Sequence, residues 1–157
     1  QMFAALAELI PGAQHWPRFV RNRSEQFEAR FALVEVARSP SLFFDGMAGS
    51  VLPIAVSHGE GRAEFSSDAA AQAFSRLNLT AVRYINADRS AATCYPANPN
   101  GSPDGIAAIS SDSGRVTSIM PHPERSFRYV QNSWRPDGAG EASGWQRIFV
   151  NARRSLG

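Results

Sequence analysis

An α/β fold is predicted for this chain of 157 residues, because stretches of helix-forming composition alternate with short apolar stretches suited to β-strands. The clearest strand pattern lies at 27–36, where apolar and polar side chains alternate. The clearest helix pattern lies at 145–156, where apolar residues recur on one face. An apolar fraction of 43% with 19% charged residues is typical of a folded globular chain.

The first 65 residues are predicted to hold one helix followed by strands. Residues 2–9 are strong helix formers, and Pro11-Gly12 ends the pattern. Residues 16–23 look extended, and 51–56 form a short buried strand. The strand at 27–36 alternates so that Glu28 and Arg30 lie opposite an apolar face made of Phe27, Ala29, Phe31 and Leu33.

Residues 66–157 are predicted to contain two helices, a strand, a hairpin and two loops. Ser66-Ser67-Asp68 is an N-cap signal for a helix over 69–77. The run 95–105 is too rich in Pro, Gly and Asn for regular structure. The remaining elements are a strand at 82–86, a hairpin of 106–109 with 115–120, a polar loop at 131–143 and the amphipathic helix at 145–156.

Composition argues against nucleic-acid and membrane partners. All 16 basic residues are Arg, but they are spread along the chain among 14 acidic residues, and the net charge is only +2. No apolar run approaches the roughly 20 residues that span a bilayer. Cys94 is the single cysteine, so no intramolecular disulfide can form, and we expect a cytoplasmic protein.

The strongest local signal for chemistry is the run Met120-Pro121-His122-Pro123-Glu124-Arg125. Two prolines stiffen the segment around His122 in an extended geometry. In such a segment the side chains of His122 and Glu124 point the same way, so the carboxylate can orient the imidazole and stabilise its charged form. The alternative is a histidine in a proline-rich turn that merely ends a strand.

Two further stretches and Cys94 leave alternatives open. Ser57-His58-Gly59-Glu60-Gly61 is either a ligand-binding turn, where glycines allow close approach, or a tight turn after a strand. Three histidines without ligand spacing predict no metal site. The loop at 98–105 is equally compatible with a binding lid and a structural loop. Cys94 lacks the Gly-flanked turn that exposes a nucleophile, so we do not expect it to be one.

Several of these motifs, in this order, resemble the phosphoribosylformylglycinamidine synthase family. The resemblance covers essentially the whole chain and is to the C-terminal glutamine amidotransferase domain of the large single-chain form. A lone Pro-His-Pro-Glu would indicate only some triad amidotransferase. The matching runs are Gln1, Pro17–Asn22, Phe27–Arg30, Ser57–Gly61, Tyr95–Pro103, Pro121–Arg125 and the final Arg-rich helix.

The resemblance implies the C-terminal portion of a class I glutamine amidotransferase, a flavodoxin-like open sheet with flanking helices. Residues 1–157 would be the C-terminal part of that domain, with the upstream strands and the nucleophile motif outside the chain. The family uses a cysteine–histidine–glutamate triad, in which His122 and Glu124 match the histidine and the glutamate. Gln1 matches the last residue of the Gly-x-Cys-x-Gly-x-Gln turn, which puts the cysteine four residues before Gln1.

The function implied is release of ammonia from glutamine for a synthetase domain of the same polypeptide. That domain would use ATP and Mg²⁺ to convert formylglycinamide ribonucleotide to formylglycinamidine ribonucleotide in purine biosynthesis, and residues 1–157 would hold no cofactor. Gln1, Ser24, His58 and Gly59 are predicted to contact glutamine. The alternative for 23–24 and 58–59 is that, as in related enzymes, they belong to interface loops.

The segment alone is predicted to be inactive, and to aggregate if its missing strands leave a sheet edge unpaired. The alternatives are another triad glutaminase or an inactive interaction domain that docks on a synthetase.

Overall fold

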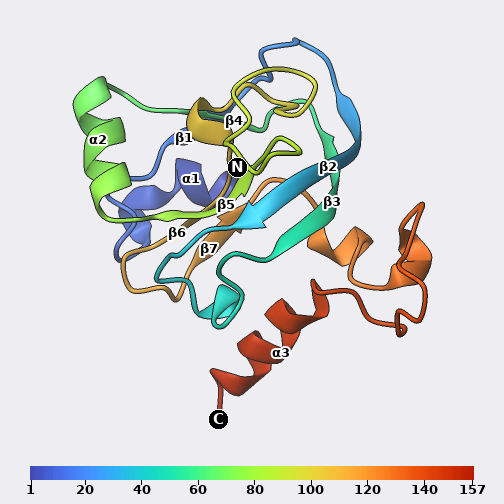
Figure 1. The fold of residues 1–157 in the computed structure, drawn as a ribbon. Helices are drawn as coiled ribbons and strands as arrows, with labels where there is room; N and C mark the ends of the chain where they lie inside the picture. The colour runs from blue at the N-terminus through green and yellow to red at the C-terminus, as the bar shows by residue number, and fades with distance from the viewer.

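A five-stranded sheet forms the centre of the computed structural model, which describes residues 1–157 (Figure 1). Its strand order is β3-β2-β5-β6-β7, and every neighbouring pair is antiparallel. The strands are β2 (Glu28–Val36), β3 (Val51–His58), β5 (Thr80–Tyr84), β6 (Ile106–Ser110) and β7 (Thr117–Ile119). Two short strands, β1 (Arg18–Val20) and β4 (Arg62–Glu64), form a separate antiparallel pair.

Three helices accompany the sheet, so the predicted α/β class is confirmed. They are α1 (Met2–Ala5), α2 (Asp68–Arg76) and α3 (Gln146–Arg154), and none is long and apolar enough to cross a membrane. Single 3₁₀ turns lie at Ala7–Leu9, Leu42–Phe44, Pro103–Gly105, Pro123–Arg125 and Tyr129–Gln131. The α2 cap is as predicted, because the Ser67 hydroxyl accepts from the Ala70 amide at 3.1 Å.

The helix predicted over 2–9 is broken, and this prediction was wrong in its extent. The α-helix stops at Ala5, and a 3₁₀ turn follows after Leu6. Only Ala4 of this stretch is buried, whereas Met2 and Leu9 are exposed. Because isolated helices this short are marginal in water, good helix formers without a buried face do not sustain a longer helix.

The strands were predicted well except at their ends and at β4. The structure gives 28–36 for the predicted 27–36, and β3 extends two residues further than predicted, to His58. The strand predicted at 82–86 lies at 80–84, and the hairpin strands are Ile106–Ser110 and Thr117–Ile119. Strand β4 has three residues, too few to show an alternating pattern, and pairing with β1 defines it.

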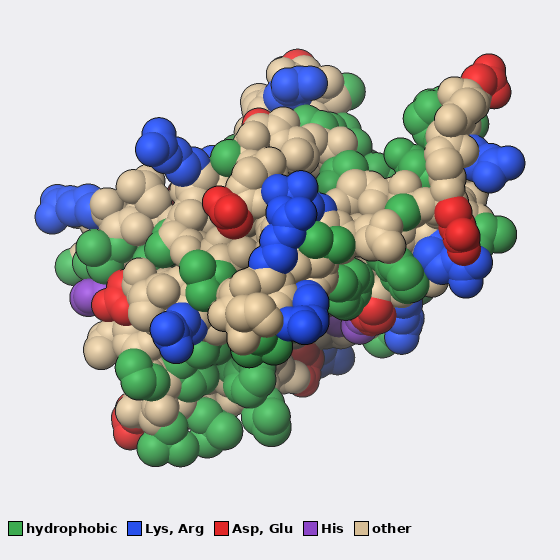
Figure 2. Space-filling model, turned by 90° about the horizontal axis from the view of Figure 1, so that it is seen from below, with side chains coloured by type: hydrophobic (Ala, Val, Ile, Leu, Met, Phe, Trp, Pro, Cys, Tyr) green, Lys and Arg blue, Asp and Glu red, His purple; other side chains and the backbone are tan.

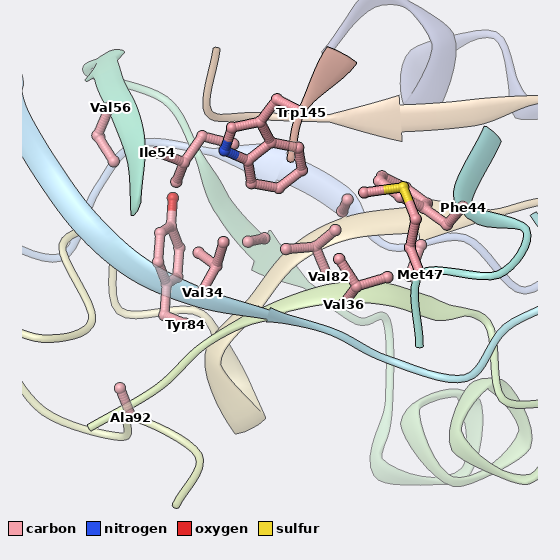
Figure 3. Packing of buried hydrophobic residues seen from close by; sticks show 13 residues of the cluster. Val34, Val36, Phe44, Met47, Ile54, Val56, Val82, Tyr84, Ala92 and Trp145 are labelled. Carbon is pink, nitrogen blue, oxygen red and sulfur yellow. The ribbon is translucent and has the colours of Figure 1, made fainter. Parts of the chain in front are cut away.

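The main core joins side chains of β2, β3, β5 and β6 to Phe44, Met47 and Trp145. Trp145, just before α3, is fully buried and faces Val34, Ile54 and Tyr84 from three different strands (Figure 3). Its indole N–H donates to the Pro53 carbonyl at 2.7 Å. The C-terminal segment is thereby tied to β3, the strand that also contacts the site residues.

The loop at 95–105 is a structural element with satisfied polar groups. The buried Asn98 amide donates to the carbonyls of Ala92 and Ser102 at 2.9 and 2.8 Å. Asn100, also buried, donates to the Gly61 carbonyl at 2.7 Å. Of the two interpretations that composition left open, the structural one describes 98–102, because side-chain amides there replace backbone pairing.

The arginines do not form a continuous basic surface on the face drawn in Figure 2. Their side chains lie apart, with acidic, apolar and other residues between them. On that face the arginines are therefore scattered in space, as they are along the sequence.

Candidate functional site

His122 and Glu124 lie in contact as predicted, but the predicted extended geometry ends at His122, and Glu124 lies in a 3₁₀ turn. The Glu124 Oε1 atom is 2.7 Å from His122 Nδ1. A carboxylate only accepts, so Nδ1 carries a hydrogen and the Nε2 side of the ring is directed away from Glu124. Arg125 Nε lies 3.8 Å from the same oxygen. The side chain of His122 is 29% exposed and that of Glu124 54%, so the pair lies at the surface of this chain.

The backbone around His122 is fixed by β3. The His122 amide donates to the Ala55 carbonyl at 2.7 Å, which extends the edge of the sheet by one bridge. Pro121 and Pro123 are buried on either side of His122, and Pro123 begins the 3₁₀ turn that places Glu124. His122 Nε2 is 3.4 Å from the Ser57 carbonyl oxygen. Because Glu124 occupies Nδ1, proton exchange with another group can occur only at Nε2, where the Ser57 carbonyl can accept from the charged ring.

The turn at Ser57–Gly61 is held by two buried asparagines. The Asn22 amide donates to the His58 carbonyl at 2.8 Å, and its oxygen accepts from the Gly61 amide at 3.0 Å. Asn100 binds the Gly61 carbonyl from the other side. Backbone groups that a loop would otherwise leave unpaired are thereby satisfied, so the turn is rigidly placed beside His122.

His58 is buried beneath that turn, with 8% of its surface exposed. Its Nδ1 lies 3.3 Å from the Met120 carbonyl oxygen, and its Nε2 is buried without a partner. Burial lowers the pKa of His58 below its ordinary value, with the nearby His122 acting in the same direction; the Met120 carbonyl and Glu28 partly oppose this. His58 is therefore a neutral imidazole at physiological pH.

Gln1 is brought to the same turn from the far end of the sequence. Its side-chain amide donates to the Glu60 carboxylate, and its amino group lies 3.9 Å from the Met120 sulfur. Beside it, α1, β1 and the end of β4 enclose a cleft of about 540 Å³ lined by Gln1, Trp16, Arg18 and Glu64 among others. Gln1, the turn and the histidine segment thus converge.

Ser24 lies at a different cavity, of about 430 Å³, together with Cys94. The Ser24 hydroxyl donates to the buried Glu28 carboxylate at 2.9 Å, and Arg30 pairs with the other oxygen of that carboxylate. Neither His122 nor Glu124 lines this cavity. The exposed Cys94 lines the same cavity as Ser24 and Glu28.

Sequence reasoning missed Glu60, Asn22 and Asn100 as site residues. Glu60 was noticed only as part of the glycine turn, and its contact with Gln1 spans 59 positions. The two asparagines hold the turn from loops that composition identifies only as irregular. Within the chain, no three His, Cys, Asp or Glu side chains are grouped closely enough to hold a metal ion.

The site therefore consists of a surface imidazole, a carboxylate on one of its nitrogens and a rigid turn beside the other. Such a pair serves as the base and orienting acid of a nucleophilic hydrolase. Residues 1–155 match the CobB/CobQ-like glutamine amidotransferase domain, and the chain belongs to that family.

The fold resembles a solved chain in the structure of PurLQS from Thermotoga maritima, with a TM-score of 0.61 and 22% sequence identity. The match covers 90% of this chain and 53% of that one, so the chain spans about half the length of the structure it matches. The likeness confirms the amidotransferase-like α/β fold. All sheet pairs within residues 1–157 are antiparallel.

Proposed function

We propose that residues 1–157 supply the histidine and glutamate of a cysteine–histidine–glutamate glutaminase site in a phosphoribosylformylglycinamidine synthase. The observation that carries the proposal is the 2.7 Å contact between His122 Nδ1 and Glu124, which leaves Nε2 as the proton acceptor. Membership of the glutamine amidotransferase family sets the substrate class. The likeness to PurLQS supports the choice of purine enzyme.

The nucleophile in this proposal is a cysteine four residues before Gln1, on the turn that leads into α1. His122 Nε2 takes the thiol proton, and the sulfur attacks the carboxamide carbon of glutamine. The tetrahedral intermediate collapses as His122 returns the proton to the departing nitrogen, which leaves as ammonia. Water then attacks the thioester carbon while His122 accepts a proton from it. The carbon–sulfur bond breaks, the sulfur takes that proton back, and glutamate is released.

Glu124 and the Ser57 carbonyl stabilise His122 while it holds the proton. An imidazolium donates from both ring nitrogens, and these two groups are the acceptors that face them, at 2.7 and 3.4 Å. Neither acceptor has to move when the proton arrives, so the stabilisation is preorganised.

Of the residues predicted to contact glutamine, Gln1, Gly59 and Ser24 are proposed as contacts, with unequal support. Gln1 and Gly59 lie at the turn beside His122, where a glycine leaves the backbone accessible. His58 is buried beneath the same turn. Ser24 donates a hydrogen bond to Glu28 in the other cavity. Ser24 could therefore contact the glutamine molecule only if glutamine passed through that cavity.

The ammonia is proposed to serve a synthetase domain of the same polypeptide. That domain would bind ATP, Mg²⁺ and formylglycinamide ribonucleotide and form the amidine. The protein is expected to act in the cytoplasm, without nucleic-acid or membrane partners.

The test compares glutamine-dependent and ammonia-dependent amidine formation by the full-length protein and its His122→Ala variant. Loss of the glutamine-dependent reaction by about 10³-fold or more, with the ammonia-dependent reaction retained, is expected for removal of a triad base. Equal glutamine use by both proteins would refute the assignment of His122. Absence of glutaminase activity in the unaltered protein would instead indicate an interaction domain.

The isolated residues 1–157 provide a second test. Without a nucleophile beside His122 they should release no ammonia from glutamine. Appreciable release of ammonia by this segment would contradict the proposed position of the cysteine. Cys94 would then become the candidate nucleophile.

A further inference from the structure

The side chain of His58 has one hydrogen bond, and its partner lies in the segment that carries His122. Its Nδ1 is 3.3 Å from the Met120 carbonyl oxygen. Because a carbonyl can only accept, Nδ1 must carry the hydrogen of the neutral ring, and the lone pair lies on Nε2. This fixes both the tautomer and the direction of the donor.

The other edge of the His58 ring is closed by Gly61. A Cβ added at Gly61 would overlap Nε2, and Nε2 itself is buried without a hydrogen-bond partner. A ligand atom can reach Nε2 only if the turn moves, and Asn22 and Asn100 hold the turn in place. The arrangement suits a donor to Met120 and does not suit a direct contact with substrate.

Three contacts from β3 hold the segment Met120–His122. The Ala55 carbonyl accepts from the His122 amide, and the Ser57 carbonyl faces His122 Nε2. Both belong to the backbone. The hydrogen bond from His58 to Met120 is the one contact of the three that depends on a β3 side chain. Met120 precedes Pro121-His122 directly, and a proline between them limits how far the two can move independently.

We infer that His58 is a positioning residue, which sets the orientation of the His122 imidazole by anchoring the Met120 carbonyl. This inference rests on the proposed function and assigns His58 to alignment of the base rather than to binding of glutamine. A displacement of a catalytic group by about 1 Å can lower a rate by roughly 10²-fold while substrate contacts are unchanged.

The test uses two substitutions of nearly equal size in the full-length protein. His58→Asn can place its amide N–H where Nδ1 donates, whereas His58→Leu has no donor. We expect His58→Asn to retain kcat for glutamine hydrolysis within about 3-fold. For His58→Leu we expect kcat to fall by about 10- to 100-fold, with KM changed by less than about 2-fold. The same two substitutions at the exposed His15 serve as controls and should change neither value.

A second measurement separates positioning from misfolding. Ammonia-dependent amidine formation and the thermal unfolding midpoint report whether the His58→Leu protein is folded, and the rate of alkylation of the nucleophilic cysteine reports its alignment with His122. A folded His58→Leu protein with slowed alkylation supports the inference.

Three results would overturn the inference: equal kcat for the Asn and Leu variants, a rise in KM with kcat unchanged, or unaltered alkylation. If His122→Ala also left glutamine hydrolysis intact, the proposed function itself would fail. That outcome is distinct from failure at His58 alone.

Discussion

Replacing Glu124 by Gln isolates the contribution of its charge to the site. The introduced amide would still present an oxygen to His122 Nδ1, at the position where the Glu124 Oε1 atom now lies 2.7 Å away. What disappears is the negative charge that stabilises the imidazolium during the reaction. Glu124→Ala, in contrast, removes both the charge and the acceptor that orients the ring.

The expected fall in kcat for Glu124→Gln depends on how far the Glu124 side chain is exposed to water. A hydrogen bond to a charged group contributes about 1.5–3 kcal/mol, against about 0.5–1.5 kcal/mol for a neutral one. The Glu124 side chain is 54% exposed, so water screens the charge and the smaller end of the difference applies. A loss of about 1 kcal/mol in the transition state corresponds to roughly a 5-fold fall in kcat for Glu124→Gln. Loss of orientation should lower kcat by about 10²-fold for Glu124→Ala.

The assay is steady-state glutamine hydrolysis by the full-length protein, measured as ammonia released, with ammonia-dependent amidine formation as the control for folding. Wild-type kcat in Glu124→Ala would refute the role of Glu124 altogether. Equal, large losses of kcat in both variants would refute the idea that charge and orientation contribute separately. Such losses would also show that the charge of Glu124 stabilises the imidazolium more strongly than the exposure of its side chain implies.

Three other outcomes are expected. Cys94→Ser should leave glutamine hydrolysis within about 2-fold of wild type, because Cys94 lies at the cavity of Ser24 and not beside His122; a dead variant would contradict this placement. Trp145→Phe should lower the free energy of unfolding by about 1–3 kcal/mol in a denaturant titration, because it leaves the Pro53 carbonyl without its donor and a void in the core. The pKa of His58 is lowered in the folded state, so the unfolded chain binds a proton first as the pH falls below the ordinary value of 6.5, and stability decreases there. The His58→Asn variant should lose less stability at low pH than the wild type does. If the thermal midpoints of the two proteins changed identically with pH, the prediction would be contradicted.

Local patterns in the sequence were sufficient for most elements. Alternation predicted β2 with one residue of error, and a serine followed by a run of helix formers predicted α2 and its cap. The contact of His122 with Glu124 was predicted from a spacing of two residues, but the extended geometry behind that prediction was wrong, because Pro123 begins a 3₁₀ turn that places Glu124. The helix at 2–9 was not, since its extent depends on which of its residues find a partner to pack against.

The environment of the pair was decided by tertiary structure. His58 reaches Met120 across 62 positions, and Gln1 reaches Glu60 across 59, so no local pattern could reveal either contact. The Ser57–Gly61 turn was visible as a glycine-rich motif, but only the fold shows that it lies beside His122.

Residue order alone thus predicts an imidazole with a carboxylate two residues away and a proline on each side of the histidine. The alignment of the two groups, and the residues around them, follow from the folded arrangement of the strands and turns. The physical reason is that torsional restriction acts between neighbours in the chain, whereas burial and hydrogen bonding join groups from distant strands that meet only after the sheet has formed.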